Sequence, residues 1–329
     1  MMLRVKQFLA MAGLTALEAI RQPICLLLTA GCVVSIAAVP LTIMHLFGED
    51  GKQVRDSAFA IHFVFGLFMA GHAAGTLLSG EIKKGTASAV LSKPVSRELF
   101  FLSKFAGIAA VILVFSVGAT IATLLSERVA EKFYYTQALN GYVMDSQTGM
   151  MLFFSPFLAC ICAGIINYRF KRPFTSSAFW MIIIFLLIVL FVSGFFERNG
   201  QWRPYSLRLD SRIFAVSILV SLALVVLSAV AITISTRFDI MPTMILCSVI
   251  FMFGLMTDYI LGRHVAESYV CGFFYTVLPN WQNFWVADAL SGGGHVPWIY
   301  VLHAGLYAVV YTVGVLCLGM LSFRHTEVK

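Results

Sequence analysis

Charged residues are scarce in this chain: only 12% of its 329 residues are Asp, Glu, Lys or Arg, while 60% are hydrophobic. Soluble domains carry about 25% charged and about 45–50% apolar residues. The mean hydropathy of +0.88 is equally far from that range. The composition therefore excludes an ordinary soluble protein and predicts an all-α polytopic membrane protein.

Sequence motifs for nucleotide chemistry are missing as well. The chain has one Gly-Lys pair, Gly51-Lys52, and Gln53 follows it where a P-loop needs Ser or Thr. The run LSGGG at 290–294 resembles the start of the signature of cassette ATPases, but without a P-loop we interpret it as a flexible connection. We expect no enzymatic activity and no cofactor in this chain.

The cysteines do not form a disulfide or metal pattern. There are seven, an odd number, and most lie inside apolar runs. Cys160 and Cys162 are two residues apart, so on a helix their sulfurs point about 200° apart. We interpret the cysteines as small packing residues and predict no metal site.

The chain has about eight apolar runs that are long enough to cross a hydrocarbon core of about 30 Å. They lie near Ile24–Leu46, Ser57–Ser79, Leu102–Leu125, Met150–Asn167, Phe174–Phe195, Ile213–Thr236, Ile240–Leu261 and Val296–Ser322. The fourth run is short and the fifth follows closely, so six spans with these two re-entrant or displaced is the alternative.

The distribution of Lys and Arg predicts the orientation, because cytoplasmic flanks carry the excess. With both termini cytoplasmic, the inner segments hold 14 of the 23 Lys and Arg residues. Four arginines nevertheless crowd one predicted outer loop: Arg198, Arg203, Arg208 and Arg212. We expect an integral protein of the bacterial cytoplasmic membrane, with lipid and not nucleic acid around it.

The first 23 residues predict an interfacial helix. Arg4, Glu18 and Arg21 gather on one side of a helical wheel, and apolar residues such as Leu9 gather on another. Pro23 favours a break before the first span. No small-residue cleavage site of the kind that ends a signal peptide follows a short apolar region.

The stretch GEIKKGTASAVLSKPVSRELFF at 80–101 is unusually charged for its position between two apolar runs. From Glu81 to Ser92 it is compatible with a short helix interrupted early by Gly85, and Pro94 favours a turn before the third span. On composition alone it reads as a positive-inside loop.

The order of residues in this stretch resembles the cytosolic loop of the ABC-2 family of ABC transporter permeases. The matching positions are Glu81, Gly85, Thr86, Ser92, Lys93, Pro94, Val95, Ser96, Arg97 and Lys104. Segments 235–255 and 277–290 resemble the branch of that family named for multicopper-enzyme maturation. We recognise no family motif between Glu127 and Trp202, so if six spans are usual, the fourth and fifth runs would be an addition.

This resemblance implies a permease subunit that pairs with a second copy or a related permease and with separate cassette ATPases, which bind ATP and Mg²⁺. It implies that the loop is a coupling helix seated in the ATPase, and that Glu18 and Arg21 of the N-terminal helix face the same surface. The coupling residues would be Glu81, Lys83, Lys84, Gly85, Thr86, Ser92, Lys93, Pro94, Ser96 and Arg97.

The predicted organisation is then a single transmembrane domain, 24–322, between an N-terminal helix, 1–23, and a cytosolic tail, 323–329. Within it we expect the coupling loop at 80–101 and outer loops at 126–149, 196–212 and 262–295. Few charges fall inside the spans, which favours an amphipathic or hydrophobic substrate. We interpret outer aromatic residues, among them Trp202 and Trp281, as an interfacial belt.

Two other classes of function stay open at this stage. A secondary carrier would use His62, His72 or Asp258, although no run of acidic partners accompanies them. A membrane scaffold would make the basic loop incidental. A requirement for a nucleotide-hydrolysing partner separates both classes from a permease.

Overall fold

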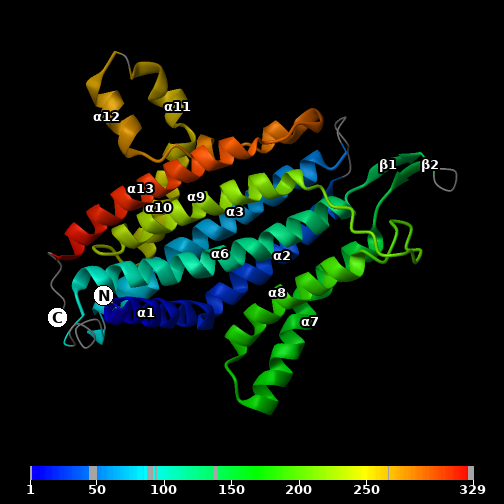
Figure 1. Cartoon of the computed structure of the whole chain (residues 1–329), viewed down its shortest axis with the longest axis horizontal. Coiled ribbons are helices and arrows are strands. Elements are labelled where there is room, and N and C mark those ends of the chain that lie inside the picture. The colour runs from blue at the N-terminus through cyan, green and yellow to red at the C-terminus, as the bar shows by residue number, and fades with distance from the viewer. Residues whose placement is uncertain are drawn as a thin grey trace.

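The computed structural model describes residues 2–43, 50–83, 85, 86, 92, 95–135, 140–265 and 267–324. These residues form a bundle of long helices with one small β-hairpin (Figure 1). The first half contains α1 (Met2–Arg21), α2 (Pro23–Thr42), α3 (Lys52–Ala74), the π-helical turn η1 (Gly75–Ser79), α4 (Gly80–Lys83), α6 (Arg97–Val129), β1 (Lys132–Tyr135), β2 (Asn140–Val143), α7 (Ser146–Phe170) and α8 (Phe174–Ser193). The second half contains α9 (Arg212–Ile234), α10 (Ile240–Leu255), α11 (Thr257–Ile260), η2 (Gly262–His264), α12 (Tyr269–Val277), η3 (Trp281–Asn283), η4 (Ala287–Gly293) and α13 (Trp298–Arg324).

Seven helices in the described part of the chain are long and apolar enough to cross a membrane, and an eighth crossing is possible through a bent pair. The bent pair joins α10 to the 257–264 segment at 57°. The prediction of an all-α polytopic membrane protein with about eight spans is confirmed. Within the predicted seventh span, Ile240–Leu261, the helix is broken at Met256.

Three helices form the centre of the bundle. In their most apolar stretches, 67% of residues in the α3 span, 72% in α6 and 72% in α9 are buried, against 28% in α7, 33% in α8 and 28% in α13. The α3 and α9 backbones approach closely because Gly66 leaves room for the side chain of Leu224. The peripheral helices expose apolar faces, as expected of surfaces in contact with lipid.

The α7–α8 pair is a hairpin that diverges from the bundle towards its tip (Figure 1, green). The Asp145 side chain caps α7 by accepting a hydrogen bond from Thr148 N at 3.0 Å. The hairpin turns at Lys171, which has a left-handed φ of 55°. Both helices pass the length and hydropathy criteria for a span, which favours eight spans over the six-span alternative.

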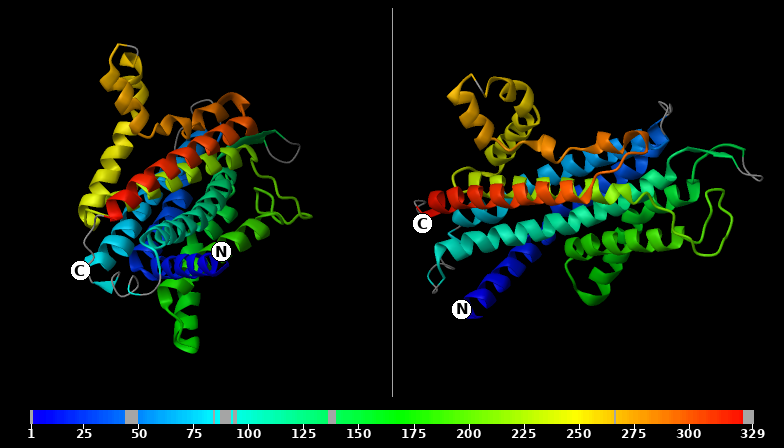
Figure 2. Two further views of the ribbon diagram at one scale, coloured as in Figure 1. Left: turned by 60° about the vertical axis from the view of Figure 1, so that its left-hand side comes forward. Right: turned by 45° about the horizontal axis from the view of Figure 1, so that its top comes forward.

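The two chain ends lie at the same end of the bundle. α1 begins and α13 ends there, and the β1–β2 hairpin lies at the opposite end (Figures 1 and 2). We call these the terminal end and the far end. At the far end α6 continues through Val129 into the predicted loop 126–149, and the antiparallel β1–β2 hairpin follows it.

The N-terminal helix is broken from the first span as predicted, because α1 ends at Arg21 and α2 begins at Pro23. Pro23 occupies the first turn of α2, where its missing N–H costs no intrahelical hydrogen bond. Trp281, in contrast, is wrongly predicted as part of an aromatic belt. It is 1% exposed and packs against Phe63 and Phe251 in the core.

Candidate functional site

The terminal end contains a three-way ionic contact centred on Lys104. Its ammonium group donates to Glu81 Oε1 at 2.5 Å and lies 3.9 Å from Glu18 Oε2. The Lys104 side chain is 8% exposed, and it also lies over the Phe100 ring, 5.6 Å from the centroid. One nearly buried cation thus joins α1, α4 and α6, three elements that are separated in sequence.

Glu81 owes its position to an irregular turn in the helix before it. Residues Gly75–Ser79 form the π-helical turn η1 between α3 and α4. Such turns insert an extra residue and are frequent at functional sites. Gly75 lies against Ile240, whose Cα would be 2.7 Å from a Cβ at this position, so η1 also packs closely on the start of α10.

The chain leaves this helix at Gly85. Gly85 has a φ of +70°, and its N–H donates to Ile82 O at 3.2 Å. The Thr86 hydroxyl donates to Glu81 O at 3.3 Å. The predicted interruption at Gly85 therefore falls at a left-handed residue, a conformation that glycine adopts without strain.

A second ionic contact joins α4 to α10. Lys83 Nζ donates to Asp239 Oδ2 at 2.6 Å, and the Ser79 hydroxyl donates to Asp239 Oδ1 at 3.2 Å. The hydrogen bond from Lys83 lowers the pKa of Asp239 below its ordinary value. Both side chains of this ion pair are more than half exposed, so solvent screens it.

The start of α6 is attached to the end of α13. Ser96 caps α6 by accepting from Leu99 N at 3.2 Å. Arg97 donates to Arg324 O at 3.0 Å, and the Arg324 guanidinium lies 3.5 Å from Glu98. Arg97 and Glu98, near the end of the predicted coupling loop, thus link it to the last span.

The α1 helix crosses α6 at very short range. A Cβ on Gly107 would be 2.6 Å from both Ala12 O and Thr15 Cβ. Beside this crossing lies an open groove of about 780 Å³. Its lining combines apolar residues of α1 with Glu18, Glu81, Val95 and Lys104, so it has an apolar wall and an ionic end.

The structure brings most of the predicted coupling residues to the terminal end. Glu81, Lys83, Gly85, Thr86, Ser96 and Arg97 lie in the contacts above, and Glu18 and Arg21 line the groove. Ser92 is exposed and lies in a turn. Lys84, Lys93 and Pro94 lie outside the described residues. In the described residues Glu81 pairs with Lys104 and with no arginine.

Two residues of this site carried no predicted role. Lys104 was recognised as part of the loop motif, but nothing in a single basic residue on an apolar run indicates that two carboxylates converge on it. Asp239 was missed altogether, since its partner Lys83 is 156 residues away. One sequence feature did point to Asp239: it directly precedes the predicted span at Ile240, and a carboxylate at a helix N-terminus interacts favourably with the helix dipole.

Two residues that a secondary carrier would use, His62 and Asp258, are held in place by contacts within the bundle. His62 is fully buried in α3 and packs edge-on against Phe115. Asp258 accepts hydrogen bonds from Tyr275 and Asn280, both at 2.8 Å, which holds the 269–283 segment against α11. Among the described residues no group of three or more His, Cys, Asp or Glu side chains is arranged to hold a metal ion.

A protein-family model matches the chain. The sequence model described as "ABC-2 family transporter protein" matches residues 20–186, which is half of the chain. The match contains η1, Glu81 and Lys104, and it runs across α7 into α8, so the stretch without a recognised motif lies largely inside the family match. The segments at 235–255 and 277–290, on which the branch resemblance rested, lie beyond it. No curated protein matches the chain. The chain thus belongs to the ABC-2 family of transporter proteins and is an integral membrane component of a transporter.

Proposed function

We propose that the chain is the permease subunit of an ATP-binding cassette transporter whose ATP is hydrolysed by a separate ATPase subunit. The observation that carries this proposal is the contact of Lys104 with both Glu81 and Glu18. It couples the loop between the second and third spans to α1 and α6. A force applied to this loop would reach three parts of the bundle at once.

The mechanism follows from the connections of the 80–101 segment. A cassette ATPase that closes on ATP would displace the segment seated in it. α3 enters the segment through η1 and α4, and α6 leaves it at Arg97, so both central helices would tilt. The exposed pair Lys83–Asp239 and the Arg97 contact with Arg324 would carry the displacement to α10 and α13.

The coupling residues are part of this proposal. Glu81, Lys83, Gly85, Thr86, Ser92, Ser96 and Arg97, with Lys84, Lys93 and Pro94 from outside the described residues, would form or support the helix that enters the ATPase. Glu18 and Arg21 would face the same partner from α1, since both side chains are exposed beside the groove.

The orientation and the assembly belong to the proposal as well. The terminal end would be cytoplasmic, in a bacterial inner membrane, because Lys and Arg are denser on its flanks. A second copy or a related permease would complete the transporter, with ATP and Mg²⁺ bound by its ATPases. The sparse charges of the spans favour an amphipathic or hydrophobic substrate. The name of the branch associated with multicopper-enzyme maturation is no evidence for a copper site in this chain, since no cluster of Cys, His or Met in the sequence has the spacing of metal ligands.

The test is co-purification with cassette ATPases of the same organism in mild detergent, followed by an assay for vanadate-sensitive ATP hydrolysis. We expect a stable complex with the unaltered chain. Glu81→Lys and Lys104→Glu should each abolish it, because each places like charges against Lys104 or Glu18. The combined Glu81→Lys/Lys104→Glu chain restores opposite charges and should recover the complex in part.

The matched control is Glu267→Lys, a charge reversal at a carboxylate whose side chain is 76% exposed and that pairs only with His264 among the described residues. It should leave the complex intact. A complex that survives both single reversals at Glu81 and Lys104 would show that this contact has no part in coupling. A folded chain that binds no ATPase at all would refute the permease proposal.

A further inference from the structure

The far end contains a basic cavity that the proposed function does not use. It has a volume of about 330 Å³ and lies between the end of α6, the β1–β2 hairpin and the 194–212 segment. Its lining includes six basic residues: Arg128, Lys132, Arg198, Arg203, Arg208 and Arg212. Among the described residues three acidic ones line it, Glu127, Glu197 and Asp210, which leaves a net formal charge of +3.

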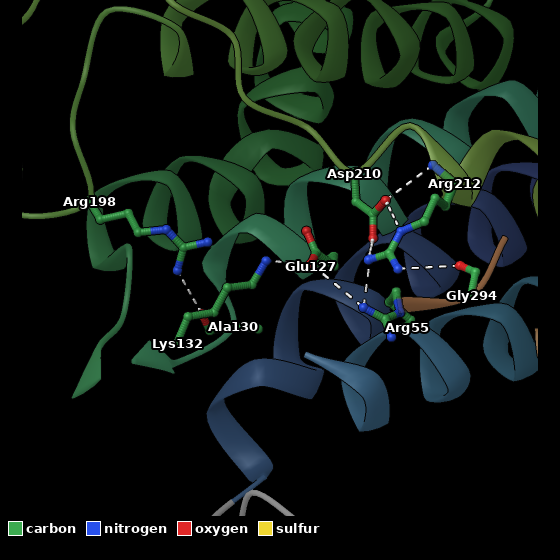
Figure 3. Close-up of polar contacts among 8 residues, drawn as sticks. All are labelled: Arg55, Glu127, Ala130, Lys132, Arg198, Asp210, Arg212 and Gly294. Carbon is green, nitrogen blue, oxygen red and sulfur yellow. Dashed lines mark hydrogen bonds and ion pairs between the residues drawn. The ribbon is translucent and has the colours of Figure 1, made fainter. Parts of the chain in front are cut away.

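The carboxylates at the floor of this cavity are already neutralised. Glu127 lies 3.9 Å from Arg55 and is also paired with Lys132 (Figure 3). Asp210 lies 3.7 Å from Arg55 and accepts two hydrogen bonds of 2.8 Å from the Arg212 guanidinium. Each of these two carboxylates thus has two cationic neighbours, so neither neutralises Arg203 or Arg208.

Arg128 belongs to the framework of the cavity. It is 4% exposed, and it donates to Asp145 at 2.9 Å, to Ser193 at 3.2 Å and to Phe196 O at 2.8 Å. Asp145 is completely buried. These contacts fix the end of α6 against the start of α7 and the end of α8 on one side of the cavity.

Two arginines of the cavity, Arg203 and Arg208, have no acidic partner among the described residues. Arg203 donates to Ser206 O at 2.5 Å, but its Nε is buried without a hydrogen-bond partner among the described residues. Arg208 is exposed. Neither has a carboxylate within 4.0 Å in the described part of the chain, and an Arg fork matches the oxygens of a phosphate group.

The cavity is at the depth of lipid headgroups if α6, α8 and α9 span the bilayer. α6 ends and α9 begins at residues that line it, and Ser193 at the end of α8 accepts a hydrogen bond from Arg128 in its lining. Beside it lies an aromatic cluster in which Trp202 stacks on Phe195 with ring centroids 5.2 Å apart, and Trp202 is 71% exposed. Exposed Trp next to Arg is typical of the membrane–water interface.

We propose that this cavity binds a phosphoryl oxyanion, supplied as the headgroup of an anionic phospholipid in the leaflet at the far end. Arg203 and Arg208 hold the phosphate oxygens, and the stacked Trp202–Phe195 pair lies beside the glycerol and upper acyl region. Bound lipid would brace the 194–212 segment against the end of α6. This inference stands independently of the ATPase partner.

The experiment is hydrogen–deuterium exchange on the full chain in lipid nanodiscs, read at peptides of the 194–212 segment. Nanodiscs of zwitterionic phosphatidylcholine are compared with discs containing phosphatidylglycerol. We expect exchange in this segment to slow by about tenfold with phosphatidylglycerol, the factor that one charge-assisted hydrogen bond supplies. The Arg203→Gln/Arg208→Gln chain should lose this protection.

The control variant is Arg169→Gln/Arg172→Gln, which removes two exposed arginines from the tip of the α7–α8 hairpin. It should keep the protection at 194–212. Arg208→Gln alone retains the Arg203 contact with Ser206 and should lose part of the protection even if the double variant folds poorly. Arg203→Lys/Arg208→Lys keeps the positive charges but loses the bidentate guanidinium donors, and should retain part of the protection at 194–212.

A second arm adds inorganic phosphate to the phosphatidylcholine discs. Protection by phosphatidylglycerol alone identifies the lipid as the ligand. Protection by inorganic phosphate supports the oxyanion site but assigns it a soluble ligand. Equal exchange under all conditions, or protection that survives Arg203→Gln/Arg208→Gln, overturns the proposal.

Discussion

The two ends of the bundle are held together in different ways. At the far end the ionic contacts include a fully buried pair: the Arg128 side chain is 4% exposed and Asp145 is not exposed at all. At the terminal end the contacts include exposed pairs, with side-chain exposures of 65% for Lys83 and 51% for Asp239. Breaking one partner of a buried pair costs about 3–5 kcal/mol, whereas exposed pairs contribute little.

This difference fits the proposed coupling, in which the ATPase would apply force at the terminal end of the bundle. In the proposed mechanism, the buried contacts at the far end would keep the helices in register, and the exposed contacts at the terminal end would let α4, α6 and α10 move relative to one another. Lys104 is the exception at the terminal end, because it is nearly buried and links α1 to α4 and α6. The predictions below test the contrast, from the largest expected effect to the smallest.

The largest effect is expected from Arg128→Met. The substitution leaves the Asp145 carboxylate buried without its cation, and should destabilise the fold by about 3–5 kcal/mol. Denaturant unfolding in detergent measures it. Arg208→Gln at the exposed rim is the control and should change stability little. An Arg128→Met/Asp145→Leu chain should regain part of the loss, since neither charge of this pair remains, while the Asp145 cap of α7 is lost. Equal stability of Arg128→Met and Arg208→Gln would contradict a rigid far end.

Gly107→Leu should have the next largest effect, at the crossing of α1 and α6. The new side chain would overlap the Ala12 carbonyl and Thr15, at a cost of about 1–3 kcal/mol, and would push α1 away from Lys104. We expect loss of ATPase stimulation with retained expression. Gly164→Leu is the matched control, because nothing lies within 4 Å of a Cβ there. An unaltered transporter would show that α1 is not needed for coupling.

The pH dependence of stability should reflect Asp210 at the far end. Burial raises the pKa of this carboxyl, but hydrogen bonds from Arg212 and the nearby charges of Arg212 and Arg55 outweigh it, so the pKa is lower than the ordinary value of 3.8. Asp210 therefore stabilises the fold above about pH 3.8, and this contribution is lost as the pH falls through its lowered pKa. Thermal unfolding between pH 3 and pH 7 should show the loss only at the acid end, and Asp210→Asn should remove it. A loss centred near pH 6 would point to another group.

The smallest effect on stability is expected from Lys83→Gln, because its contact with Asp239 is open to water. The thermal midpoint should not change measurably. If this pair transmits motion to α10, ATP-driven transport should fall while ATPase binding persists. A stability loss as large as that of Arg128→Met would remove the distinction between the two ends.

Much of the candidate site was predictable because its residues are close in sequence. Gly85, Ser96 and Arg97 belong to one short motif, and the left-handed turn at Gly85 and the cap at Ser96 are local effects. The pairing of Glu81 with Lys104 was not predictable, because it depends on how the π-helical turn η1 rotates Glu81 towards α6. The link from Lys83 to Asp239 was equally hidden, since α10 approaches η1 only after the bundle has packed.

The sequence by itself determined the class of protein, the approximate number of spans and the break before Pro23. Span length and hydropathy depend on composition within about 20 residues, so they can be read without a fold. Tertiary structure alone decided the bend at Met256, the burial of Trp281 and the choice of ionic partners at both ends. These features depend on which helix faces meet, and some of those faces come from residues more than 100 positions apart in the chain, as in the contacts of Asp239 with Ser79 and Lys83.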